Sequence, residues 1–102
     1  MSSSAPALRS YSTDHLEIPG FLDDAVTAYI DWQQSRMRKD NLKSEFRRAG
    51  ALALADGLDL EQIYEEQDPD FFIRQGVKRG ITHRFVHDIK VWVERYCTVE
   101  EL

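Results

Sequence analysis

The apolar residues of this chain recur at spacings of three and four, and this periodicity constrains the fold more than any other feature. The clearest case is the segment 81–97, whose apolar stripe consists of Ile81, Phe85, Ile89, Trp92, Val93 and Tyr96. Such spacing places the apolar residues on one face of an α-helix, where they can pack against a core. No segment alternates with period two for long enough to indicate a strand. The pattern therefore predicts an all-α chain.

Four further helices, of which the last two are short, are predicted by the same periodicity and by local start signals, and their expected ranges are 21–38, 42–56, 59–66 and 69–75. Asp59 followed by Gln62 is typical of a capping box, and Asp68 before Pro69 is a second start signal. Gly50 weakens its helix by up to about 1 kcal/mol relative to Ala, but it would let another helix approach closely. Together these segments predict a compact five-helix bundle with a long C-terminal helix.

The chain divides into a short tail and one domain. Residues 1–16 are Ser-rich and have no apolar face, which predicts a flexible tail, and residues 17–102 form the helical domain. No apolar run approaches the roughly 20 residues of a membrane span, so no membrane partner is expected. The single cysteine, Cys97, excludes an intrachain disulfide and fits a reducing compartment. We therefore expect an intracellular protein, nuclear or cytoplasmic.

The charged residues are segregated along the chain. The net charge of −5 gives no general attraction to nucleic acid or to an acidic membrane surface. Residues 56–70 contain seven acids and no Lys or Arg, whereas residues 74–84 contain four basic residues, one histidine and no acid. A second basic cluster, residues 36–48, has six basic residues against two acids. Any binding driven by charge should therefore be local.

The run that begins at Gly76 and ends at Ile89 resembles the end of a sterile alpha motif (SAM) domain. In that family a glycine and an aliphatic residue, here Gly76 and Val77, precede a second glycine, here Gly80, and then a long last helix. The resemblance covers residues 57–97, including the two short central helices, and is poor over the N-terminal half. It implies a SAM-like interaction domain whose central helices and start of the last helix form two faces that join head to tail.

The resemblance and the charge pattern together predict association with another copy or with another SAM-like domain. The acidic face would comprise Asp59, Glu61, Glu65, Glu66 and Asp70. The basic face would comprise Lys78, Arg79, His83 and Arg84. The alternative is that both are solvated surfaces whose intrachain ion pairs contribute at most about 1 kcal/mol each. Phe71 and Phe72 are adjacent and cannot both point inward from a short helix, so one of them is a candidate interface anchor.

Nucleic-acid binding is the alternative function, and it would use the basic residues of the segment 36–48 to follow a phosphate backbone. These residues are Arg36, Arg38, Lys39, Lys43, Arg47 and Arg48.

We expect neither an enzyme nor a cofactor. His83 and His87 lie four apart on one helix face, but no third metal ligand accompanies them. Cys97 ends a helix, where the dipole opposes a thiolate. No nucleophile motif or phosphate-binding loop is present.

Overall fold

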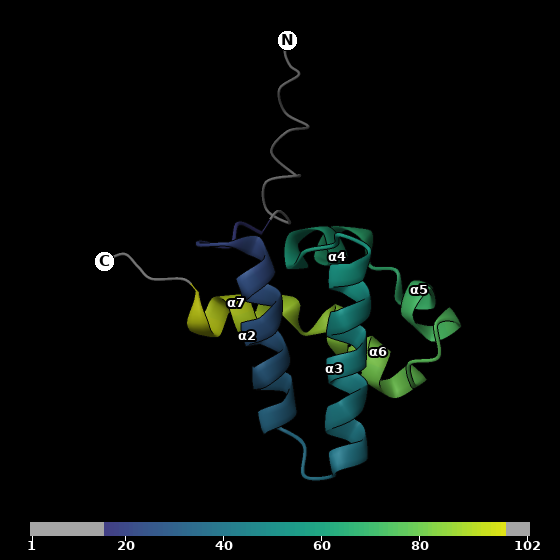
Figure 1. Ribbon diagram of the computed structural model, residues 1–102. Coiled ribbons are helices and arrows are strands. Elements are labelled where there is room, and N and C mark those ends of the chain that lie inside the picture. The colour runs from purple at the N-terminus through teal and green to yellow at the C-terminus, as the bar shows by residue number, and fades with distance from the viewer. Residues whose placement is uncertain (1–15, 98–102) are drawn as a thin grey trace.

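The computed structural model describes residues 16–97, and this part of the chain is helical without strands (Figure 1). Its six helices are α2 (Leu22–Ser35), α3 (Asp40–Ala55), α4 (Leu60–Glu66), α5 (Pro69–Arg74), α6 (Arg79–His87) and α7 (Ile89–Tyr96). The predicted tail lies outside the described residues except for Leu16, which is half-buried against the core. The all-α prediction is confirmed for the described part of the chain, but the number of helices differs from the prediction.

The two long helices α2 and α3 form an antiparallel hairpin joined by the short loop 36–39 (Figure 1). Asp23 and Asp24 lie in the first turn of α2, where negative charge complements the helix dipole. The two helices approach closely at Gly50, because a Cβ atom there would lie 2.7 Å from Cγ1 of Ile30. The expected role of Gly50 in close helix packing is therefore confirmed.

Local start signals place the two short helices as predicted. The Asp59 carboxylate accepts a hydrogen bond from the Gln62 N–H at 3.0 Å, and the Gln62 side chain accepts one from the Asp59 N–H at 3.0 Å. This reciprocal pair is a capping box. The Asp68 carboxylate accepts a hydrogen bond from the Asp70 N–H at 3.2 Å, at the start of α5. The sequence therefore located both starts correctly.

The prediction of one long C-terminal helix is wrong, because the segment is broken at Asp88 into α6 and α7. In a continuous helix the Phe85 carbonyl would accept a hydrogen bond from the Ile89 N–H. Here that carbonyl accepts one from the Tyr29 hydroxyl of α2 at 2.7 Å. A side chain inserted into the helical hydrogen-bond ladder is a common cause of a kink. The bundle therefore has six helices in its described part and not the predicted five.

A buried polar network surrounds this break. Gln33 is fully buried, and its side-chain nitrogen donates to the Tyr29 hydroxyl at 3.0 Å and to the Arg84 carbonyl at 3.3 Å. The Asp88 carboxylate lies 3.4 Å from the same nitrogen and 3.1 Å from the Arg36 guanidinium. Burial raises the pKa of Tyr29 well above its ordinary value. The hydroxyl therefore stays protonated and keeps its donor role even above the ordinary tyrosine pKa of about 10.

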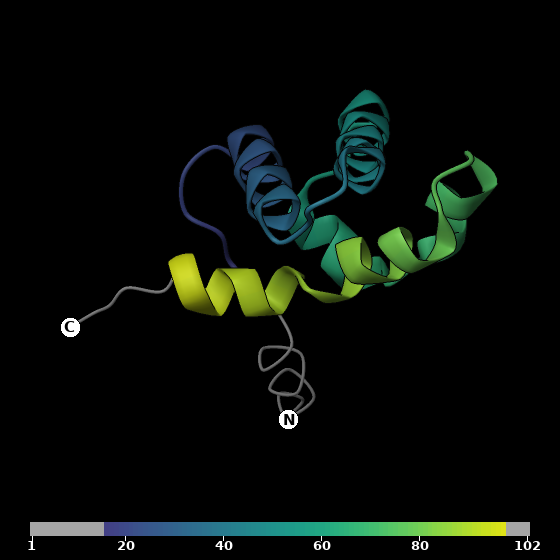
Figure 2. The same ribbon diagram turned by 90° about the horizontal axis from the view of Figure 1, so that it is seen from below.

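The core lies between the α2–α3 hairpin and the α6–α7 segment, which runs across one side of the hairpin (Figure 2). The ring of Tyr29 lies 5.6 Å from those of Phe85 and Trp92, and Phe72 lies 5.1 Å from Phe85. Tilted and edge-on contacts of this kind contribute about 0.5–1.5 kcal/mol each beyond burial of area. Five residues of the predicted C-terminal stripe are buried, whereas Tyr96 is 58% exposed. The periodicity thus identified the buried face although it missed the break.

Candidate functional site

The acidic face lies on α4 and α5, and α4 sits beside the upper end of the hairpin in Figure 1. Three of its five acids are exposed: Glu65, Glu66 and Asp70. The other two are half-buried and engaged within the chain. Asp59 caps α4, and the Glu61 carboxylate accepts a hydrogen bond from the Ile18 N–H at 2.9 Å. The exposed negative charge is therefore concentrated toward the end of α4 and the start of α5.

The basic face lies at the start of α6, and all four of its residues are exposed. Two side chains of α3, Glu45 and Arg48, hold the turn that leads into it, and we call this pair the α3 clamp. The Lys78 N–H donates to the Glu45 carboxylate at 2.8 Å, and the Arg48 guanidinium donates to the Gln75 and Gly76 carbonyls at 3.0 and 3.3 Å. These carbonyls follow the end of α5, where helical carbonyls lack partners within the helix. The clamp fixes the direction in which the basic face points.

The C-terminal part of the basic face is partly engaged on its own helix. The Arg84 guanidinium lies 3.5 Å from the Asp88 carboxylate, four residues later, and its side chain is 51% exposed. The ring of His83 stacks on that of His87 at a centroid distance of 5.7 Å. Lys78 and Arg79 are therefore the best-placed cations for contact with a partner.

The structure gives little support for a metal site at His83 and His87 or for a nucleophile at Cys97. Among residues 16–97, no group of three or more His, Cys, Asp and Glu residues is arranged to bind a metal ion. His83 and His87 thus have each other as neighbours but no third ligand in this region. Burial raises the pKa of the Cys97 thiol, which disfavours the reactive thiolate.

The aromatic pair of α5 is divided between core and surface. Phe72 is 2% exposed and packs edge-on against Phe85, because α5 lies against α6. Phe71 is half-buried, and its ring lies 5.0 Å from that of Phe72. Phe72 is therefore unsuitable as an interface anchor and must be removed from the predicted set. Phe71 remains the candidate.

Three of the six basic residues of the segment 36–48 contact other side chains or carbonyls of the same chain. The Arg36 guanidinium lies 4.5 Å from the centre of the Trp32 ring and 3.1 Å from the Asp88 carboxylate. Arg47 donates to the Gln34 side chain at 2.7 Å. Arg48 donates to backbone carbonyls of the α5–α6 turn. The remaining three cations lie in or next to the α2–α3 loop: Arg38, Lys39 and Lys43. Nucleic-acid binding by this segment remains a prediction, with fewer available cations than the sequence suggested.

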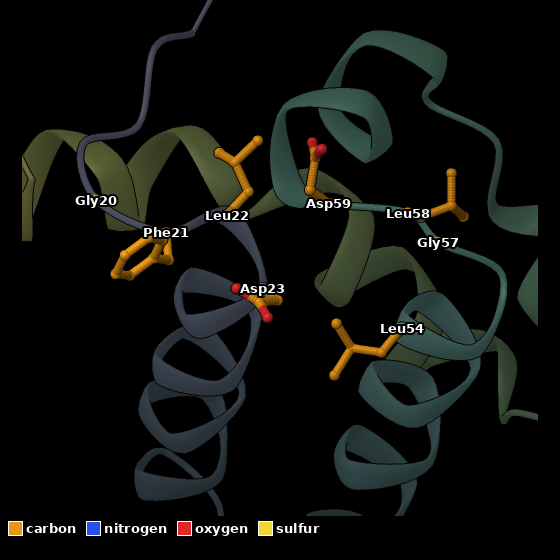
Figure 3. A pocket seen from close by; sticks show the side chains of 8 residues that line it. All are labelled: Gly20, Phe21, Leu22, Asp23, Leu54, Gly57, Leu58 and Asp59. Atoms are coloured by element: carbon orange, nitrogen blue, oxygen red, sulfur yellow. The ribbon is translucent and has the colours of Figure 1, made fainter.

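Sequence reasoning missed a groove between the start of α2 and the end of α3 (Figure 3). It has a volume of about 500 Å³ and is lined by Gly20, Phe21, Leu22, Asp23, Leu54, Gly57, Leu58 and Asp59. Phe21 is 78% exposed and Leu54 is 43% exposed. Phe21 precedes its helix, and Leu54 lies near the end of α3 but is not among its buried residues. A large apolar residue outside the buried face at each of two neighbouring helix ends was the signal that could have revealed the groove.

No family model matches this chain, and neither does any curated protein or solved structure. The SAM resemblance therefore remains a prediction carried by residues 57–97. Within the described residues, no helix is both long enough and apolar enough to cross a membrane.

Proposed function

We propose that this chain is a protein–protein interaction module that joins head to tail with another copy, or with another SAM-like domain. The acidic face of one molecule would contact the basic face of the next. The observation that supports this proposal is the separation of two exposed, oppositely charged surfaces onto different elements, α4–α5 and the start of α6. One molecule can therefore use both surfaces at once. A nuclear or cytoplasmic location goes with this proposal, because a single cysteine suits a reducing compartment.

The consequence of such a contact is an assembly larger than a dimer. Because the two surfaces differ, the interface is heterologous and leads to rings or filaments, not to a closed two-fold dimer. Complementary charge sets the register and the association rate more than the affinity. Phe71 lies on α5 beside the acidic residues and would supply apolar contact area. The mass in solution should accordingly rise with concentration and fall with salt.

A mixing experiment tests the proposal directly. The variant Lys78→Glu/Arg79→Glu removes the basic face, and the variant Glu66→Lys/Asp70→Lys removes the acidic face. Each variant alone should be monomeric in size-exclusion chromatography with light scattering. Their mixture should associate again, because each partner keeps the face that the other has lost.

The control is a matched double charge reversal outside both faces. Lys90 and Arg95 are exposed on α7, so Lys90→Glu/Arg95→Glu makes the same change in net charge. This control should retain the mass of the wild-type chain. A mixture that stays monomeric would exclude the head-to-tail contact, and so would a control that dissociates as fully as the basic-face variant.

A further inference from the structure

The groove between α2 and α3 exposes apolar surface that the head-to-tail contact leaves uncovered. Among the described residues five large apolar side chains are exposed, and three of them line this groove: Phe21, Leu22 and Leu54. The other two, Val91 and Tyr96, lie on α7. The basic face contains none of the five. A copy docking through its basic face would therefore bring no large apolar side chain to fill the groove.

The charge around the groove is negative. Asp23 and Asp59 line it, and among residues 16–97 no Lys, Arg or His lines it. Exposed Asp24 and Asp56 lie next in the chain to groove-lining segments. Figure 3 shows the groove bounded on one side by the start of α2 and on the other by the end of α3, with Asp59 above. An occupant must therefore combine apolar side chains with positive charge.

We propose that this groove binds an amphipathic helix of another protein, with an apolar stripe flanked by Lys or Arg. A helix of this kind places apolar side chains into a groove at spacings of three and four, and its basic flanks meet the acidic rim. The groove has a volume of about 500 Å³, which apolar side chains of such a helix would fill. The site is distinct from the head-to-tail contact, with which it shares only Asp59. It adds a second, different partner to the proposed function.

The test uses the full chain and a synthetic peptide of Leu and Lys, with Leu at helical stripe positions and a fluorescent label. Binding is followed by fluorescence anisotropy, and a scrambled peptide of identical composition is the control for charge alone. Phe21→Ser/Leu54→Ser should weaken binding by about tenfold or more, because anchor side chains carry most of the energy of such contacts. Val91→Ser removes an apolar residue of similar exposure on α7 and should change binding by less than about twofold.

Three results would overturn the inference. The first is a scrambled peptide that binds as tightly as the amphipathic one, and the second is a groove variant that binds as tightly as the wild type. The third is a loss of self-association in Phe21→Ser/Leu54→Ser, seen by light scattering, because a second copy would then occupy the groove. The measurement is repeated on Lys78→Glu/Arg79→Glu, where peptide binding should persist. Failure of the head-to-tail proposal and failure of this one are thereby distinguished.

Discussion

Replacing Tyr29 by Phe removes one oxygen atom from the centre of the protein and tests why the C-terminal segment is broken. The hydroxyl donates to the Phe85 carbonyl at 2.7 Å and accepts from the Gln33 side chain at 3.0 Å. The residue is fully buried, so the variant loses both of these buried hydrogen bonds, while the Gln33 side chain keeps the Arg84 carbonyl as an acceptor at 3.3 Å. One intramolecular hydrogen bond contributes about 0.5–1.5 kcal/mol net, so the two together contribute about 1–3 kcal/mol. The ring and its aromatic contacts remain.

We therefore expect Tyr29→Phe to lower the free energy of unfolding by about 1–3 kcal/mol in urea denaturation followed by circular dichroism. Tyr96→Phe makes the same chemical change at a site that is 58% exposed, and should stay within about 0.5 kcal/mol of wild type. In the variant the Phe85 carbonyl is released for the Ile89 N–H, so hydrogen exchange of that amide should slow. Equal stability of the two variants, or faster exchange at Ile89, would refute the role assigned to Tyr29.

The same hydroxyl predicts a dependence on alkaline pH. Burial raises the pKa of Tyr29 in the folded state above the unfolded value of about 10. A raised folded pKa contributes stability that is fully present below the unfolded pKa and is lost as pH rises above it. Wild-type stability should therefore fall above about pH 10, and the fall should be smaller in Tyr29→Phe. Parallel pH profiles for the two proteins in urea denaturation would contradict this assignment.

Five further substitutions test packing, the interface anchor and the contact of Arg48 with the α5–α6 turn. Gly50→Ala should lower stability by about 1 kcal/mol in urea denaturation, because overpacking outweighs the gain in helix propensity; Gly80→Ala, where a Cβ meets nothing within 4 Å, should be neutral or stabilising. Phe72→Ala should cost about 3–5 kcal/mol as a buried aromatic truncation. Phe71→Ala should cost less than Phe72→Ala and, if Phe71 anchors the contact, should lower the mass seen by light scattering. Arg48→Gln should speed amide exchange in the α5–α6 turn, and unchanged exchange would show that the clamp is unimportant.

The parts of the fold that the sequence predicted correctly depend on short-range signals. Asp59 and Asp68 cap helices through hydrogen bonds that span three and two residues, so a local reading finds them. The break at Asp88 depends on a hydroxyl 56 residues away from the carbonyl that it contacts. The apolar periodicity continues across that break without a change. A one-dimensional pattern therefore identified the buried face but could not reveal the interruption.

For the candidate site too, the sequence revealed local features but not contacts between residues that are distant in the chain. The segregation of acidic and basic residues is visible in the sequence, and most of those side chains are exposed. The sequence could not show that Glu61 is engaged by the Ile18 N–H, 43 residues away, or that Arg48 is used to clamp a turn. The sequence reveals the sign of the charge on each segment, whereas tertiary contacts decide which of the charged side chains are available to a partner.

The two proposed contacts should oppose each other. Both bring positive charge to the same acidic end of the molecule, and Asp59 borders both surfaces. A basic helix in the groove would therefore repel the basic face of an approaching copy. Because linkage is reciprocal, self-association should weaken peptide binding by the factor by which the peptide weakens self-association. Salt should reduce this coupling, since the Debye length is only about 8 Å at physiological ionic strength. A partner carrying such a helix would then limit the length of a head-to-tail assembly without contacting the basic face.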